Sequence, residues 1–457
     1  MVKKPLVVAV SAACLNLSLI AASHAAGFVE DSKATLSLRN FYINTDNRNG
    51  TANPSRVMDW GQGFMLNYQS GFTQGTVGFG VDAVGMLGLR LDSGGKANGA
   101  NGGSVQNGTM FPRDTDNSAV DEFSSLGATA KMKISETEFR YGTLIPKIPV
   151  AVSNDGRLLP QTYRGAQVTS KDIQNLTLVA GQLQSAKNRN STDQDQLSIA
   201  GANSGASARD SNKFNFIGGD YKVTKDLTLQ YYFGQLEDFY NQHFLGLTHN
   251  VKLGDGTFKT DLRYFDSNGQ GENRKADTTG LYASTGYYGG TRTLGEVDNR
   301  LYSGLFTYSI YGHTFGLGYQ GTNGNSAFPY LNEAGGASTY AITDIQINNF
   351  TRSGEDTWQA RYSYDFGQLG VKGLTAGVIY QRGDNIRTSA GNDFMEWERD
   401  LTVSYVIPEG QLKGLGFTWR NASLRTDLPA ASRQAGVPSQ RDVDENRLIV
   451  SYTLPLL

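Results

Sequence analysis

Residues 258–264 read Phe258-Lys259-Thr260-Asp261-Leu262-Arg263-Tyr264, and this pattern decides the fold class. Phe, Thr, Leu and Tyr occupy alternate positions, and Lys, Asp and Arg occupy the positions between them. Successive side chains of a β-strand point to opposite faces, so a period of two predicts a strand with one apolar and one polar face. The same alternation recurs at residues 227–233, 358–364 and 374–380.

The connections between these stretches indicate what each face meets. Short turns, such as residues 223–226 and 366–371, alternate with long connections rich in Gly, Asn, Ser and Asp. The long external loops are predicted near residues 92–123, 146–165, 188–210, 266–298 and 321–354. Short turns at one end and long loops at the other are typical of outer-membrane β-barrels, whose apolar face meets lipid and whose polar face lines water. We therefore predict an all-β fold, a closed antiparallel transmembrane β-barrel of about 18 strands.

Composition agrees with a barrel. Only 39% of the residues are hydrophobic, whereas Gly is present 55 times and Tyr 23 times in 457 residues. Few apolar residues and many Tyr suit a polar lumen with aromatic girdles at the membrane surfaces. No run of 18 apolar residues follows position 25, which argues against membrane-spanning helices. The net charge is −2 and no basic block occurs, so nucleic-acid binding is not expected.

Residues 1–25 have the layout of a secretory signal peptide. Lys3 and Lys4 precede an apolar run over residues 5–20, and small residues surround the predicted cleavage site after Ala25. The remaining residues 26–457 are predicted to form a single porin domain in the outer membrane of a Gram-negative cell. The only cysteine, Cys14, lies in the signal segment, so the exported chain has neither a disulfide nor a Cys-based metal site.

Some basic residues fall on the polar face of their predicted strands. These residues are Arg39, Arg263, Arg361 and Arg420. A guanidinium facing lipid at mid-depth costs ~2–4 kcal/mol, so these side chains are expected to face the lumen. A file of such groups can pass a carboxylate along by successive charge-assisted contacts. Alternatively, they form salt bridges within the wall, with partners such as Asp261, Asp365 or Glu398.

Residues 146–165 contain three prolines between two strand patterns, so this segment cannot be a central strand. It is predicted to fold into the bore as a constriction loop. The candidates to line the constriction are Asp155, Arg157, Tyr163 and Arg164, although some could instead pin the loop to the wall. Asp298, just before a strand, is a further candidate that would place an acidic group opposite the bases.

Several segments resemble one family. They include Phe28-Val29-Glu30-Asp31-Ser32, residues 155–165 (Asp-Gly-Arg-Leu-Leu-Pro-Gln-Thr-Tyr-Arg-Gly), residues 312–320, Trp397-Glu398-Arg399-Asp400 and residues 420–425. Together they are similar to OprD-type porins, also called Occ channels, of pseudomonads and their relatives, and they span nearly the whole chain. The resemblance implies a narrow eyelet in an 18-stranded barrel and a ladder of lumenal bases that guides small carboxylates.

Two more arginines join the candidates: Arg425, which lies further along the strand of Arg420 past a break in parity, and Arg382, which the family ladder adds. Arg382 has the outward parity of Tyr380, so its inclusion rests on the resemblance alone. The chain also departs from the family pattern. Ser404 and Thr418 stand where family members often carry another base, which implies a thinner ladder.

These observations favour a substrate-selective diffusion channel for small water-soluble organic solutes. Carboxylates such as aromatic acids or amino acids are the expected solutes, and outer-membrane lipid and lipopolysaccharide are the expected surroundings of a monomer or loose homotrimer. No cofactor is expected. The alternatives are a general non-selective porin and a membrane-embedded hydrolase. His243, His249 and His313 fall on different strands without metal-ligand spacing, so neither a metal site nor enzymatic activity is predicted.

Overall fold

The structure is a computed structural model, and it describes residues 27–48, 55–94, 105–106, 108, 110–199, 209–275, 281–284, 295–331, 338–388, 391–428 and 442–457. The predicted signal segment, residues 1–25, lies outside the described residues. Within them, no helix is long and apolar enough to cross a membrane.

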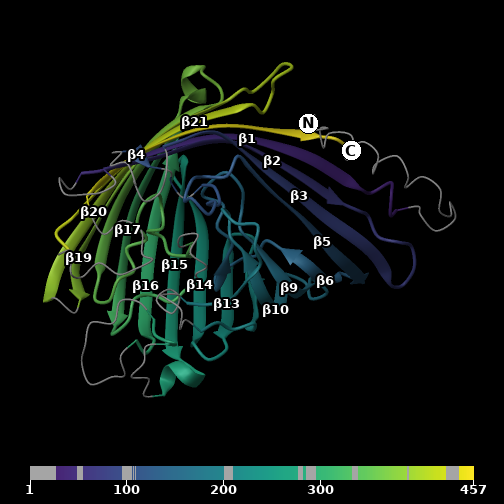
Figure 1. Ribbon diagram of the computed structural model, residues 1–457, viewed down its shortest axis with the longest axis horizontal. Coiled ribbons are helices and arrows are strands. Elements are labelled where there is room, and N and C mark those ends of the chain that lie inside the picture. The colour runs from purple at the N-terminus through teal and green to yellow at the C-terminus, as the bar shows by residue number, and fades with distance from the viewer. Residues whose placement is uncertain are drawn as a thin grey trace.

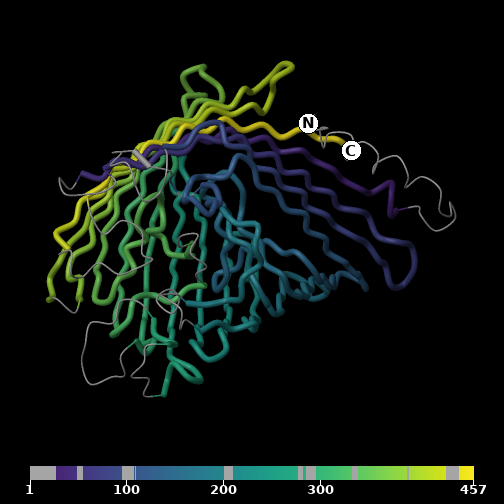
Figure 2. Tube along the Cα trace, viewed as in Figure 1, coloured from purple at the N-terminus to yellow at the C-terminus, as the bar shows by residue number. Residues whose placement is uncertain are grey.

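Eighteen of the described strands pair in a ring, each antiparallel to its two neighbours. They are β1 (Lys33–Asn47), β2 (Arg56–Gln69), β3 (Gly78–Ser93), β5 (Glu122–Ile134), β6 (Thr137–Leu144), β9 (Thr162–Ser170), β10 (Leu176–Lys187), β12 (Phe214–Lys222), β13 (Leu227–Leu236), β14 (Tyr240–Leu253), β15 (Gly256–Gly269), β16 (Asp298–Ile310), β17 (His313–Gly324), β18 (Asp356–Asp365), β19 (Leu374–Thr388), β20 (Gly391–Val406), β21 (Gly416–Thr426) and β22 (Val443–Pro455). The trace runs up and down between the two ends, with consecutive strands side by side (Figure 2).

Pairing of the last strand with the first closes the ring. β22 lies antiparallel to β1 over Thr35–Asn47, and the yellow last strand follows the purple first strand in Figure 1. Closure leaves no unpaired sheet edge within the membrane, where an unsatisfied backbone group would be costly. The predicted closed antiparallel barrel of 18 strands is thus confirmed.

The remaining elements are short and belong to the connections. They are β4 (Val105–Gln106), β7 (Lys147–Ile148), β8 (Ala151–Val152), β11 (Asp195–Gln196) and the 3-10 helices η1 (Gly271–Arg274) and η2 (Phe366–Leu369). β7 and β8 pair with each other, so the connection between β6 and β9 contains a small hairpin of its own.

The alternation predicted from sequence separates an outer from an inner face. On β17, Leu317 is 68% exposed on the outer face, whereas Gln320 on the inner face is fully buried. Outward aromatic rings form a girdle in which Tyr380 lies 5.2 Å from Trp358 and 5.8 Å from Trp397, measured between ring centroids. Apolar side chains therefore cover the membrane-facing surface, and polar ones line the lumen.

The long connections all leave and re-enter the barrel wall at the same end. They occupy residues 94–121, 145–161, 188–213, 270–297 and 325–355, close to the predicted spans. The other end carries short turns, such as residues 135–136, 254–255 and 311–312. By the usual rule for these barrels, the long-loop end is extracellular and the short-turn end periplasmic. Three predicted boundaries are wrong, because β9 begins at Thr162, β15 continues to Gly269 and β17 continues to Gly324.

The apolar core lies inside the barrel at the long-loop end. One buried cluster joins wall residues, such as Phe244 and Phe265, to loop residues, such as Val150, Phe328 and Leu331. These contacts hold the loops inside the bore. The connection at residues 325–355 is therefore not an external loop as predicted, because its apolar side chains pack inside the ring.

A second buried cluster fixes residues 145–161 against β1 and β2. Leu158 and Leu159 pack there with Phe41 and Phe111. Gly61 makes room for this loop, because a Cβ there would lie 2.9 Å from Leu158 Cδ2 and 2.7 Å from Phe111 Cζ. Glycine on the inner face of β2 thus allows the loop to approach the wall closely.

Candidate functional site

The first inward loop, residues 145–161, binds a wall arginine through its tip. Arg39 of β1 donates from Nη1 to Asp155 Oδ1 at 2.7 Å and from Nη2 to Asp155 Oδ2 at 3.2 Å. Arg39 Nη1 also donates to the backbone carbonyl of Arg157 at 2.7 Å. This bidentate pair orients the loop tip, since two parallel bonds fix the plane of both groups.

The second inward loop, of which the structure describes residues 325–331 and 338–355, crosses the bore along a file of arginines. Each of four lumen-facing guanidinium groups donates to a different backbone carbonyl of this loop. The pairs are Arg263 to Tyr340 at 2.6 Å, Arg361 to Ile342 at 2.5 Å, Arg420 to Ile345 at 3.0 Å and Arg447 to Gln346 at 2.9 Å. These arginines belong to β15, β18, β21 and β22, so residues 340–346 follow the wall across several strands.

Acidic residues of β20 hold the next part of the same loop. The two carboxylate oxygens of Glu398 accept from the backbone N–H groups of Ile347 and Asn348, each at 2.9 Å. Glu396 accepts from the Asn348 side chain at 2.9 Å and pairs with Arg352 at 3.3 Å. The wall therefore binds the carbonyls of one half of the loop and the amides of the other.

A cavity of about 260 Å³ lies between the two loops, and we call it the eyelet. Its lining includes four guanidinium groups, those of Arg157, Arg189, Arg420 and Arg447. Two carboxylates, those of Asp155 and Asp344, also line it. Among these charged groups the balance is cationic, and low-dielectric surroundings strengthen their effect on a solute.

Burial changes the pKa of several eyelet groups in the loops. It lowers the pKa of Arg157 to about 10, so this guanidinium remains charged at neutral pH. Burial, together with the charges of Arg157 and Arg447, also lowers the pKa of Arg189. Burial raises the pKa of the Asp344 carboxyl, and the backbone and side-chain bonds that it accepts from Thr339 oppose this shift. Asp344 therefore binds a proton more readily than an ordinary aspartate does.

The structure places six of the sequence candidates in or beside the bore. Arg39, Arg263, Arg361 and Arg420 occupy the inner face, and Asp155 and Arg157 line the eyelet. Arg263 also forms the wall salt bridge considered above, with Asp261 at 2.9 Å. The wall-bridge alternative is therefore observed for this residue, which also faces the lumen.

Three predicted arginines lie on the outer face. Arg382 and Arg425 stand directly opposite Trp397 in the sheet, and opposed residues share a face. Arg382 pairs with Asp384, and Arg425 pairs with Asp444, each at 2.9 Å. Arg164 is exposed on the outward parity of β9. Their predicted pore-lining roles are wrong, because strand alternation turns these side chains away from the lumen.

Two more candidates are displaced from the constriction. Tyr163 belongs to β9 and is buried in the apolar cluster, where its hydroxyl donates to Gln161 at 3.2 Å. Asp298 begins β16 at the loop end, where it accepts from Asn325 at 3.2 Å. Tyr163 packs with first-loop residues in the apolar cluster, and Asp298 links β16 to the start of the second loop. Neither residue lines the eyelet cavity.

The sequence interpretation missed Arg447 and Arg189. A signal for Arg447 was present, because Leu448 and Val450 share the outward face and thereby assign Arg447 to the lumen. Arg189 lies two residues after the end of β10 and donates to Asn154 at 2.9 Å, a contact between distant segments that no local pattern predicts.

The structure also places the residues considered for the hydrolase alternative and for the thinner ladder. The histidines His243, His249 and His313 take the outward parity of β14 and β17, and His313 shares a 3.0 Å hydrogen bond with the Tyr362 hydroxyl. Among the described residues, no group of His, Cys, Asp and Glu could hold a metal ion. Ser404 and Thr418 face the lumen and share a hydrogen bond of 2.8 Å, so hydroxyls occupy this part of the wall.

Comparisons with known proteins cover nearly the whole chain. Residues 26–456 match the family model described as outer membrane porin, OprD family. The crystal structure of Pseudomonas aeruginosa OccK8 (OprE) is 59% identical, with a TM-score of 0.84, over 94% of this chain and 100% of that one. The structure of P. aeruginosa OpdK with vanillate is 35% identical, with a TM-score of 0.79, at the same coverage. The porin-like protein GalP of Pseudomonas putida is 34% identical over 97% of each chain.

Proposed function

The chain belongs to the OprD family of outer membrane porins, and from this premise we propose that it selects small organic carboxylates at the eyelet by means of Arg157, Arg189, Arg420 and Arg447. The observation that carries the proposal is the convergence of these four guanidinium groups on one cavity of about 260 Å³. A carboxylate that enters so narrow a passage loses water, and fixed guanidinium donors replace the lost hydrogen bonds.

The second loop leaves these donors partly available. Arg420 donates from a single Nη2 atom to Ile345, although a guanidinium has five N–H donors. The remaining donors can bind one solute oxygen while the loop carbonyl keeps the side chain in place. The arginines upstream, Arg263 and Arg361, extend the file along the wall.

The size of the cavity favours compact solutes. A relative that is 35% identical to this chain was solved with vanillate, a small aromatic carboxylate. Arg39 is bound to Asp155 and therefore acts in this proposal by positioning the first loop rather than by contacting the solute.

Reversal potentials under a salt gradient test the proposal. Replacing Arg420 and Arg447 together by Gln removes two of the four eyelet cations, so anion preference and uptake of a labelled aromatic carboxylate should both fall. Replacing Arg382 and Arg425 together by Gln is the matched control, because it removes two positive charges from the outer face. Wild-type preference and uptake in the double variant, measured at low salt where charges are poorly screened, would contradict the carboxylate proposal.

A further inference from the structure

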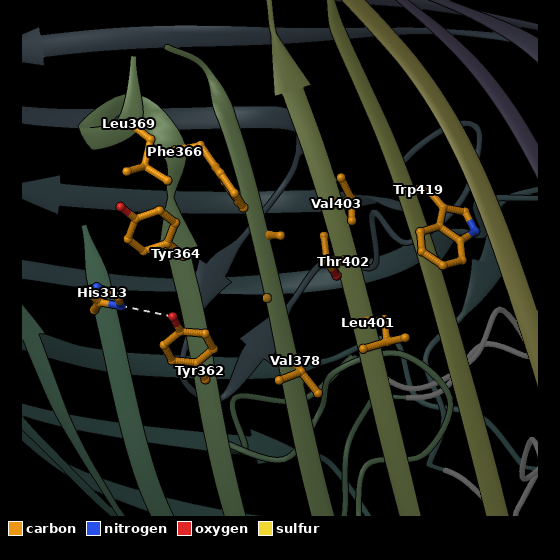
Figure 3. Close-up of a pocket in the computed structure, with 12 residues that line it drawn as sticks. His313, Tyr362, Tyr364, Phe366, Leu369, Val378, Leu401, Thr402, Val403 and Trp419 are labelled. Atoms are coloured by element: carbon orange, nitrogen blue, oxygen red, sulfur yellow. Dashed lines mark hydrogen bonds between the residues drawn. The ribbon is translucent and has the colours of Figure 1, made fainter. Parts of the chain in front are cut away.

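The outer face of β17–β21 contains an apolar groove that the channel function does not use. The groove has a volume of about 570 Å³, and its lining runs from His313 and Tyr364 across β19 to Val403 and Trp419 (Figure 3). Small residues form its floor, since Ala376 and Gly377 lie between the aromatic side chains of β18 and the larger side chains of β20 and β21.

A guanidinium stands at the extracellular end of this groove. Leu401 and Trp419 form that end, and the next outward residues on the same strands are Arg399 and Asn421. Arg399 shares the outer face with Tyr380, which stands directly opposite in the sheet. Since β20 runs from the long-loop end towards the short-turn end, Arg399 lies nearer the cell surface than the groove does.

Among the described residues, Arg399 differs from its outward neighbours Arg382 and Arg425 in that it forms no ion pair with an acidic side chain. Arg382 pairs with Asp384 and Arg425 with Asp444, whereas the hydrogen bonds of Arg399 go to the side chains of Asn421 at 2.8 Å and Ser423 at 3.1 Å. Both bonds come from Nη2, and Nε has no partner in the described part of the chain. No carboxylate of the described residues therefore neutralises the Arg399 charge.

We propose that a phosphate-bearing lipid of the outer leaflet binds here, with its phosphate on Arg399 and one acyl chain in the groove. A guanidinium facing lipid is costly unless an anion meets it, and a lipid phosphate can accept a charge-assisted N–H bond from Nη1, since Nη2 is bound to Asn421 and Ser423 and Nε is buried. Lipid tails are as apolar as the wall, so close packing in the recess, rather than hydrophobicity, favours one tail over bulk lipid.

The experiment uses the full-length barrel in detergent with diphosphoryl lipid A as the probe. Native mass spectrometry counts the bound lipid, and titration gives its dissociation constant. Three single variants are compared with the wild type. Arg399→Gln removes the phosphate contact, Ala376→Trp fills the groove floor, and Arg164→Gln removes an exposed outward arginine on the far strand β9 as the control.

Binding should weaken about tenfold in Arg399→Gln, because a charge-assisted bond is lost, and by a similar factor in Ala376→Trp. Arg164→Gln should bind like the wild type, and lipid A without its phosphates should bind like Arg399→Gln. Single-channel conductance should remain unchanged in all three variants, because these side chains lie outside the lumen. Wild-type affinity in Arg399→Gln, or equal binding of the dephosphorylated lipid, would overturn the phosphate contact. Wild-type affinity in Ala376→Trp would overturn the acyl site.

Discussion

Residues 145–161 and residues 325–355 both fold into the bore, yet the wall holds them differently. The first loop inserts Leu158 and Leu159 among apolar side chains and makes its charged contact through Asp155. The second loop also packs apolar residues, but four backbone carbonyls of its crossing segment, residues 340–346, each accept from a different arginine. One loop is thus fixed mainly by shape and the other mainly by charge, so each should respond to a different perturbation.

Removing the crossing segment should have the largest effect. Replacing residues 340–350 with a short Gly-Ser linker opens the bore and frees four guanidinium groups, so single-channel conductance should rise by about twofold or more. Replacing residues 154–160 in the same way should raise conductance less, because the arginine file stays covered. Heat-modifiable migration on gels checks that both barrels fold. A larger rise for residues 154–160 would reverse the assigned importance of the two loops.

Leu158→Ala should loosen the first loop and leave the second unchanged. The side chain is 2% exposed, so its truncation should cost about 2–5 kcal/mol by lost burial and cavity formation. Thermal unfolding followed by circular dichroism measures this cost. Val29→Ala is a control at a side chain that is 63% exposed, and it should change the midpoint little. Equal midpoints for the two variants would show that the apolar anchor is not needed.

Glu398→Gln should loosen the second loop with a smaller loss of stability. Glutamine keeps the shape but turns an N–H₂ donor towards one of the two amides, so about 1.5–3 kcal/mol of charge-assisted bonding is lost. The open-channel current should become noisier, because the backbone of residues 347 and 348 loses its hydrogen bonds to the carboxylate. Glu398→Asp, which keeps the charge, should restore part of the quiet current. Wild-type noise in Glu398→Gln would argue that the arginine bonds alone hold this loop.

Acidification should give the smallest effect. An ordinary aspartate has a pKa of about 3.9. Because burial raises the pKa of Asp344, this carboxyl takes up a proton at a higher pH. Lowering the pH from neutral therefore removes one negative charge from the eyelet, and anion preference should increase. Asp344→Asn should show the increased preference at neutral pH and a flatter response to acid. An unchanged pH response in this variant would assign the titration to another group.

The two loops also differ in how far sequence predicted them. Three prolines and polar residues between strand patterns revealed the first loop as an insertion into the bore. The second was predicted as an external loop. The wall binds this loop through its backbone carbonyls, and every residue carries a carbonyl. The side-chain pattern of the sequence therefore could not indicate these hydrogen bonds. Apolar residues such as Phe328, Ile342 and Phe350, all buried, were the local sign that the segment lies inside the barrel.

Strand parity was the most reliable guide to individual site residues. It placed Arg263, Arg361 and Arg420 in the lumen, and it also indicated that Arg382 points outward. Arg382 was predicted to line the pore because of the family resemblance, although its strand position predicts an outward side chain, and that prediction was wrong. Arg189 and Asp344 could not be assigned, because their positions depend on how loops from different parts of the chain meet.

The β1–β22 pairing has a consequence for the time course of assembly. Ser37 and Thr453 are hydrogen-bonded at 3.1 Å although 416 residues separate them in sequence. Such distant partners meet late, because closing a long chain segment is entropically costly and topologies rich in distant contacts form slowly. Until they meet, β1 and β22 both present unpaired edges that could capture a strand of another chain. We therefore expect the β1–β22 pairing to be the slowest part of the wall to form. Chaperones that cover β-edges should have their largest effect on assembly at this step.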